Sequence, residues 1–197
     1  MGAILTVLRP IGAINAALLR IGRGIGVVAL ALMVLAILIQ VVARYLFNNA
    51  LPWPDEAARF AMLWMTGLMA PTAFRRGGFV ALDVISFLLP RIISAALSLF
   101  LLLVSLAVLV VAIQIGWGEV TGFGGKFATA SLYLPTSPAF DTWFRVPRSW
   151  MMASLLVGVA LLILVNIELI LRAIASLGGR EDDLPDLTLP EDLRGAE

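Results

Sequence analysis

The chain has 197 residues, of which 61% are hydrophobic and 14% are charged, and its formal net charge is +1. Soluble domains are about half apolar and about a quarter charged, so this composition predicts a membrane protein. The sequence contains neither Cys nor His. Their lack excludes disulfides, thiol nucleophiles, iron–sulfur ligation and histidine-based haem or metal sites. The small net charge gives no sign of the basic surface that nucleic-acid binding requires.

We also expect no cofactor and no enzyme activity. The Ser, Asp and Glu residues form no recognisable nucleophile–base arrangement, and a catalytic triad without His or Cys would be unusual.

The N-terminal part of the chain, residues 1–23, carries three charges, Arg9, Arg20 and Arg23, and its apolar residues recur at roughly helical spacing. This pattern predicts an interfacial helix that leads into the membrane. A cleaved signal peptide is the alternative, but the apolar run that follows is too long for a signal-peptide core of about 7–15 residues. That run, residues 24–43, has no charge and is long enough to cross a hydrocarbon core of about 30 Å.

The apolar runs predict an all-α integral membrane protein with four transmembrane helices and short interfacial helices. Pro54 suits the first turn of the second span, where the helix dipole also favours Asp55 and Glu56. Pro71 inside that span removes a backbone donor, which a Thr or a neighbouring helix must compensate. The membrane domain covers 24–172, with spans at about 24–46, 54–74, 92–117 and 149–171.

Three further segments lie outside these spans. Residues 79–89 are expected to form a short amphipathic segment along the interface. Residues 116–149 are rich in Gly, Pro and aromatic residues, which suits a loop resting on the headgroup layer or on a partner. Residues 173–197 end in an acidic stretch that is typical of a disordered, solvated tail.

The placement of basic residues predicts the orientation. Four spans put both termini on one side of the membrane, together with the loop between the second and third spans. That side holds Arg9, Arg20, Arg23, Arg75, Arg76, Arg91, Arg172 and Arg180, and the opposite side holds Arg44, Arg59, Lys126, Arg145 and Arg148. Because short cytoplasmic loops carry the excess of Lys and Arg, both termini are expected in the cytoplasm.

Charged residues gather around the turn between the first two spans. Arg44 is expected to pair with Asp55 or Glu56 and so to pin the two helices at their outer ends. Unrelated charges reaching water are the alternative, and such surface pairs contribute about 0–1 kcal/mol. A coupling-ion or substrate site would need charges at mid-membrane, whereas these lie at the span ends.

The other polar groups in or near the spans are Gln40, Gln114, Asn166 and Glu168. Interhelical hydrogen bonds account for them more simply than a transport path does. Glu168 precedes Arg172 by four residues, which is the favourable order for a helical pair. No span has two ionisable groups at its centre, so the chain lacks the ion cage expected of a self-sufficient transporter.

The stretch 40–67 resembles the small (DctQ-type) membrane subunit of tripartite ATP-independent periplasmic (TRAP) transporters. The ending of the first helix matches at Gln40, Val41, Arg44 and Tyr45, and the opening of the second at Trp53, Asp55, Glu56, Arg59, Trp64 and Gly67. A further family block matches at Arg75, Arg76, Gly77 and Val80 to Asp83. Phe79 stands where the family often has His, so any role of that histidine is absent. The resemblance covers about 30–170.

The resemblance implies a non-catalytic scaffold in the bacterial inner membrane, surrounded by lipids. Its partners would be a large polytopic membrane subunit, which carries the substrate and coupling-ion sites, and a periplasmic substrate-binding protein. The whole assembly would use an ion gradient to take up a small solute, usually an organic acid. Two alternatives remain open: a stand-alone tetraspan channel or transporter, and a membrane anchor of another complex.

Overall fold

The computed structural model describes residues 2–76, 91–135 and 143–177. The expectations for residues 79–89, Asp83 among them, and for the tail from residue 178 onward lie outside the described residues. The elements in chain order are α1 (Gly2–Tyr45), α2 (Trp53–Arg75), α4 (Arg91–Thr121), the short 3-10 helix η1 (Phe123–Lys126), β1 (Ala128–Pro135), β2 (Trp143–Pro147) and α5 (Arg148–Leu177). The described chain is therefore mostly helical.

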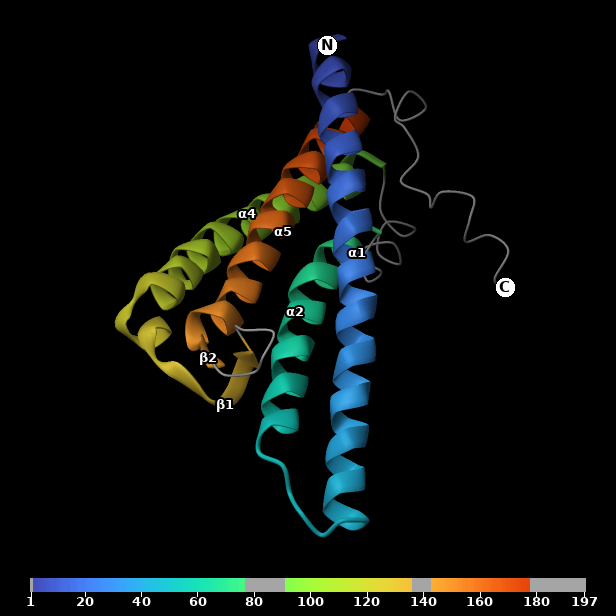
Figure 1. Cartoon of the computed structure of the whole chain (residues 1–197). Coiled ribbons are helices and arrows are strands. Elements are labelled where there is room, and N and C mark those ends of the chain that lie inside the picture. Colours follow the sequence, from blue (N-terminus) through green and yellow to red (C-terminus); the bar gives the residue numbers. More distant parts are fainter. Residues whose placement is uncertain (1, 77–90, 136–142, 178–197) are drawn as a thin grey trace, which may run out of the picture.

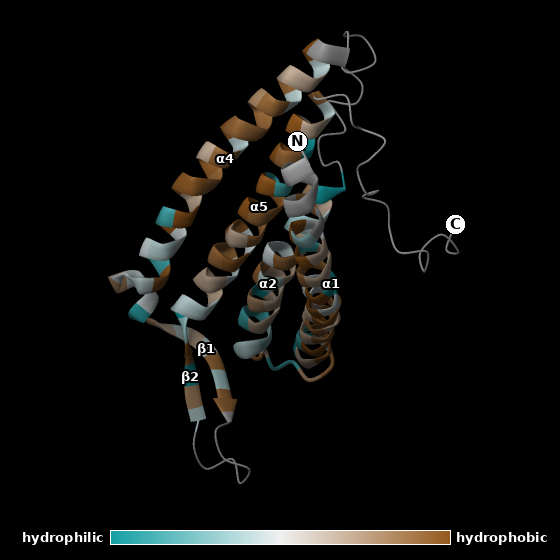
Figure 2. Cartoon of the chain, turned by 90° about the horizontal axis from the view of Figure 1, so that it is seen from above, coloured by the Kyte–Doolittle hydropathy of each residue, from teal (hydrophilic) through white to brown (hydrophobic). Residues whose placement is uncertain are grey.

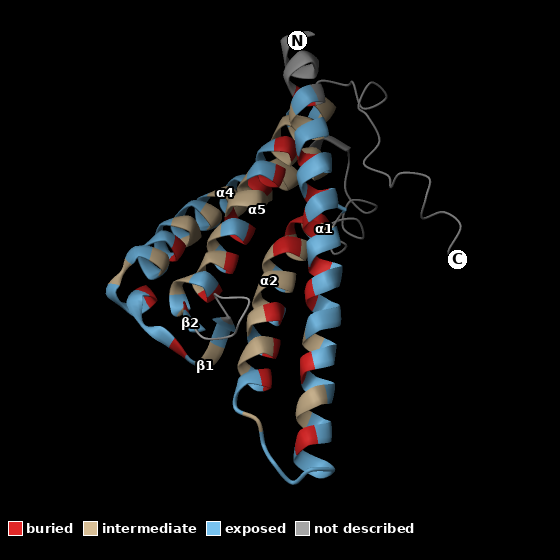
Figure 3. Ribbon diagram, viewed as in Figure 1, coloured by how far each residue is buried: buried red, intermediate tan, exposed pale blue. Residues whose placement is uncertain are grey.

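The long helices lie side by side in the order α4, α5, α2 and α1 (Figure 1). Helices α1 and α2 form an antiparallel pair, α5 packs on the other side of α2, and α4 leans away from the pair while it contacts α5. Figure 3 shows that on the long helices the buried residues lie along the seams between neighbours, while the outer faces of α1 and α4 are exposed.

Helix α1 is continuous over 44 residues, with Pro10 inside it. At a rise of 1.5 Å per residue it is about 66 Å long, roughly twice the thickness of a hydrocarbon core. Residues 2–23 and the first expected span thus belong to one helix. Six of its described buried residues recur every seven positions: Leu8, Asn15, Gly22, Ala29, Ala36 and Ala43. Leu19 and Gly26 are buried between them. The small residues of this series, Gly22, Ala29, Ala36 and Ala43, let α2 approach closely.

Three of the described helices are long and apolar enough to cross a membrane, over Pro10–Tyr45, Ile93–Thr121 and Arg148–Leu177. Figure 2 shows the apolar character of α4 along most of its length. Helix α2 does not meet the same criteria, because its sequence includes Asp55, Glu56, Arg59 and Arg75 and several weakly apolar residues. The predicted helix is present, but its crossing of the membrane is not established by composition.

Residues 116–149 differ from the expected loop. Helix α4 continues to Thr121, and strands β1 and β2 then form an antiparallel hairpin. The expectation of an all-α chain misses this hairpin because both strands are short and their pairing is irregular. Tyr133 pairs with Arg145 and Ala128 pairs with Pro147, so the register shifts between the two positions. The intervening part of β1 bulges out of the ladder.

Helices α2 and α5 approach most closely at two glycines. A Cβ added at Gly67 would lie 2.5 Å from the carbonyl oxygen of Ser154, and one added at Gly158 would lie 2.7 Å from that of Gly67. Pro71 has no N–H to donate to the Gly67 carbonyl four residues earlier. Thr66 bonds Met62 O instead, and Thr72 Oγ1 has no hydrogen-bond partner. The backbone of Gly158 therefore packs against the Gly67 carbonyl that Pro71 leaves without its helical donor. Neither Thr66 nor Thr72 supplies a replacement hydrogen bond.

Candidate functional site

A buried carboxylate joins three helices near the end of the molecule where α1 begins. The Glu168 side chain is completely buried on α5, and Arg75 on the last turn of α2 binds both of its oxygens. Arg75 Nη2 lies 2.7 Å from Oε1, and Arg75 Nε lies 3.0 Å from Oε2. This two-pronged geometry is the strongest arrangement that Arg and a carboxylate can adopt.

Helix α1 closes the cluster with Asn15 and Gly12. Asn15 Nδ2 donates to Glu168 Oε2 at 2.8 Å and to Leu164 O at 3.1 Å. Arg75 Nη2 also donates to Gly12 O at 3.2 Å. A Cβ at Gly12 would lie only 3.3 Å from Glu168 Oε1, so the absence of a side chain there lets the carboxylate sit against α1.

Arg172 completes the surroundings of the carboxylate. Its Nη2 lies 3.0 Å from Glu168 Oε1 in the predicted (i, i+4) pair, which is confirmed. One buried negative charge thus faces two arginines and an amide. Removing one partner of a buried ion pair typically costs about 3–5 kcal/mol, because the remaining charge has no compensation. We name Glu168, Arg75, Arg172, Asn15 and Gly12 the three-helix cluster.

A second polar site fixes the hairpin to the first turn of α2. The backbone N–H groups of Ala130 and Ser131 donate to Oε1 and Oε2 of Glu56. Ser131 Oγ lies 2.6 Å from Glu56 Oε2 and 2.8 Å from Pro52 O. Both N–H donors belong to the bulged part of β1, where the ladder does not use them. The bulge therefore binds the Glu56 carboxylate through two backbone N–H groups.

Arg145 on β2 holds the same bulge from its other side. It donates through Nε to Thr129 O and through Nη2 to Ala130 O, the latter at 3.0 Å. Its guanidinium also lies 5.7 Å from the centre of the Tyr133 ring, a distance compatible with a cation–π contact. The N–H groups of the bulge thus donate to Glu56, and its carbonyl oxygens accept hydrogen bonds from Arg145.

Several residues of the family-like motif lie on the face of α2 that meets α5. Trp64 Nε1 donates to Trp150 O at 3.2 Å, Gly67 packs on Ser154, and Arg75 reaches Glu168. Asp55 contacts α1 through a long hydrogen bond from Gln40 Nε2, at 3.5 Å. The motif thus includes the contacts that hold α2 between α1 and α5.

The ion pair expected between Arg44 and Asp55 or Glu56 is not found in the described part of the chain. Glu56 turns to the hairpin, and the described ion pairs are those of Glu168. The exposed residues of the motif are Val41, Arg44, Tyr45, Trp53, Asp55, Arg59 and Arg76. The predicted pairing of Arg44 with Glu56 is wrong because the hairpin brings backbone N–H donors to Glu56. These donors are far away in the sequence, so the residues around Glu56 do not predict them.

Asn166 does not form the interhelical hydrogen bond expected of it. It is completely buried, yet its Oδ1 and Nδ2 have no partner. The residues that sequence reasoning missed are Asn15, Gly12, Ser131 and Arg145. A polar Asn15 at a position of the seven-residue stripe was the available signal, because the other buried members are apolar.

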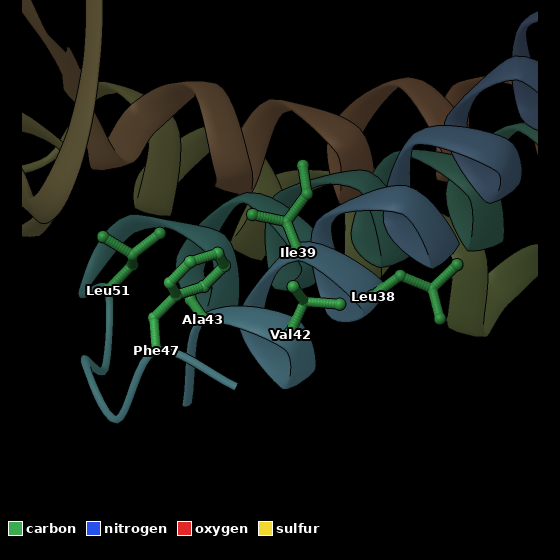
Figure 4. A pocket seen from close by; sticks show the side chains of 6 residues that line it. All are labelled: Leu38, Ile39, Val42, Ala43, Phe47 and Leu51. Atoms are coloured by element: carbon green, nitrogen blue, oxygen red, sulfur yellow. The ribbon is translucent and has the colours of Figure 1, made fainter. Parts of the chain in front are cut away.

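An apolar hollow of about 400 Å³ lies where α1 passes into the turn before α2. Figure 4 shows its lining, which comprises Leu38, Ile39, Val42, Ala43, Phe47 and Leu51. Binding sites for polar solutes need a few convergent polar groups, and these side chains supply none. Among the described residues there is also no group of acids able to hold a metal ion.

Comparison with known proteins adds one match. Residues 33–176 match the family model described as "Tripartite ATP-independent periplasmic transporters, DctQ component". The matched range includes α1 from residue 33 onward, all of α2, α4 and the hairpin, and nearly all of α5. No curated protein matches the chain.

Proposed function

We propose that this chain, which belongs to the DctQ component family of tripartite ATP-independent periplasmic transporters, is a fixed scaffold for the large membrane subunit of such a transporter. It is a small permease subunit by family. In this proposal the chain binds no substrate and no coupling ion, and it stabilises the subunit that does.

The proposed scaffold role rests on the burial and the hydrogen bonds of Glu168. Acids within membrane helices usually mark ion or substrate pathways. Glu168 is completely buried, and its oxygens accept hydrogen bonds from residues on α1, α2 and α5. A carboxylate held in this way is suited to locking helices together and has no free face for a passing ion.

Exposed apolar faces support the proposed packing against a larger subunit. Leu32 and Leu35 on α1 and Val108 and Ile115 on α4 are each more than half exposed. Lipid and partner helices both suit such faces, because helix association in membranes depends on close fit and not on hydrophobic burial. A scaffold needs a rigid bundle with broad outer faces, and α1 and α4 present them on opposite edges.

The proposed topology has four spans, with α2 as the second. Helix α2 lies between α1 and α5, both long and apolar enough to cross a membrane. Its residues 60–74 carry no charge, and its acids are confined to the first turn. The chain would lie in the bacterial inner membrane, with both termini in the cytoplasm. The first part of α1 would lie at the membrane interface.

The remaining expectations rest on the family. The partners would be a large polytopic subunit and a periplasmic binding protein, and the assembly would take up a small solute, such as an organic acid, with an ion gradient. The hairpin would face the periplasm in this topology.

Extraction in mild detergent tests the proposal. The tagged chain, expressed together with its genomic neighbours, is purified and the retained proteins are identified by mass spectrometry. A stoichiometric, much larger polytopic partner is the expected result. A homo-oligomer that transports solute alone in liposomes, with the large subunit expressed but not retained, would overturn the scaffold role and favour a stand-alone channel or transporter.

A further inference from the structure

Two arginines lie near each other where α1 and α2 pack together, and neither forms an ion pair with an acid in the described part of the chain. Arg23 belongs to α1, and Arg76 caps the end of α2. The contacts of Arg75 with Gly12 O and of Leu68 with Gly22 place the end of α2 beside this part of α1. Partial burial and the nearby positive charge of Arg23 lower the pKa of Arg76. Arg20 precedes Arg23 by three residues, a spacing that puts the two on neighbouring parts of the helix surface.

The charges of this group are not compensated within the described part of the chain. Arg23 Nε is buried and has no hydrogen-bond partner, and the described ion pairs involve only Arg75, Arg172 and Glu168. Arg75 makes a useful contrast, because it precedes Arg76 directly and is neutralised by Glu168. A charged donor that is shielded from water and has no acceptor is costly. A rotation of the half-buried Arg23 side chain toward an acceptor outside the chain would remove that cost.

The surroundings indicate where such an acceptor comes from. Arg23 ends the charge-free run 24–43, so it stands at the boundary of the hydrocarbon core. Side chains on a helix tilt toward its N-terminus, and Arg23 can therefore snorkel toward the headgroups. The neighbouring Ile21 and Ile25 are 62% and 50% exposed, and a Cβ at Gly24 would meet nothing within 4 Å. The group is therefore open to lipid.

We propose that Arg20, Arg23 and Arg76 form a binding site for the phosphate of an anionic phospholipid, in the headgroup layer at the end of the bundle where α1 begins. Guanidinium groups bind phosphate oxygens with two parallel hydrogen bonds. The acyl chains of the bound lipid would lie along the exposed apolar face of α1. Such a lipid would compensate the Arg23 charge and hold the end of α2 against α1.

Native mass spectrometry tests the site. The sample is the full-length chain, purified in complex with the membrane subunit that it retains. The probe is dioctanoyl-phosphatidylglycerol, and dioctanoyl-phosphatidylcholine of equal chain length is the zwitterionic comparison. The wild type is expected to bind the anionic lipid more tightly. Arg23→Gln and Arg76→Gln are each expected to weaken its binding about fivefold, since one basic residue near a membrane surface contributes about 1 kcal/mol.

Control variants separate this site from general charge effects. Arg44→Gln removes an exposed charge at the opposite end of α1 and is expected to leave binding unchanged. Arg23→Lys keeps the charge but loses the planar fork, and it should recover part of the affinity. Equal binding of both lipids, or equal losses for Arg23→Gln and Arg44→Gln, would overturn the proposal.

Two further arms identify the source of the anion. Inorganic phosphate at the concentration of the lipid is expected not to compete; competition would show that the site takes a soluble phosphate instead. Deletion of residues 181–197 is expected to leave lipid binding unchanged. Tighter binding after the deletion would show that the acidic tail, and not a lipid, is the resident partner of these arginines.

Discussion

Arg75 Nη2 lies 2.7 Å from Glu168 Oε1, although 93 residues of chain separate the two. The contact joins the end of α2 to α5, and Asn15 extends it to α1. Three elements from three regions of the sequence therefore meet at one carboxylate. The buried residues of the described helices lie mainly along the seams between neighbours, and this cluster and the glycine seam between α2 and α5 hold the helices in register.

Replacing Glu168 by Gln is expected to lower the free energy of unfolding by about 3 kcal/mol or more, because two partly buried arginines lose their counter-charge. Thermal unfolding of the purified protein in one detergent measures the effect. Glu119→Gln is the matched control, since Glu119 is an exposed acid on α4, and a change within about 0.5 kcal/mol is expected there. Equal shifts in the two variants would show that Glu168 has no special structural role.

Substitution of the seam glycines should separate α2 from α5. In Gly67→Ala and Gly158→Ala the new methyl group would overlap backbone atoms at 2.5 Å and 2.7 Å, which a side-chain rotation cannot relieve. Each variant is expected to lose about 1–3 kcal/mol, as in other cases of overpacking. The control is Gly118→Ala on α4, where a Cβ meets nothing within 4 Å and Ala favours the helix by up to about 1 kcal/mol. A melting temperature of Gly67→Ala equal to that of Gly118→Ala would contradict the close approach.

Loss of the Glu56 carboxylate should release the hairpin while the helices stay packed. In Glu56→Ala, the amides of Ala130 and Ser131 lose their acceptor. Their hydrogen exchange is expected to become about tenfold faster, because a hydrogen bond to a charged group is worth about 1.5–3 kcal/mol and this one is partly exposed. Arg44→Ala serves as the control, and unchanged exchange at both amides is expected. If Arg44→Ala speeds exchange as much as Glu56→Ala, the two residues act together after all.

The natural lack of cysteine allows a direct test of topology. Single cysteines at Asn49, Gly118 and Leu177 are labelled in intact cells with a membrane-impermeant maleimide. Four spans with cytoplasmic termini put Asn49 and Gly118 outside and Leu177 inside, so only the first two should react. If α2 does not cross, Gly118 and Leu177 exchange sides, and labelling at Leu177 with protection at Gly118 would refute the fourth span.

The amino-acid sequence alone determined the class of protein and the helices. A chain segment inside lipid must satisfy its own backbone hydrogen bonds, so a long charge-free run such as 24–43 has few options besides a helix. The pair Glu168–Arg172 also followed from the sequence, because helical geometry fixes the distance between positions i and i+4. Pro54, Asp55 and Glu56 likewise mark the first turn of α2 as expected.

Only the tertiary structure decided the partners of the charges. Arg44 and Glu56 are close in sequence and complementary in sign, yet Glu56 binds a β-bulge some 75 residues further along the chain. Arg75 reaches Glu168 because Gly67 and Gly158 set how closely, and in which register, α2 lies on α5. Local periodicity defines the faces of each helix, but which faces meet depends on the fit of all neighbouring helices at once.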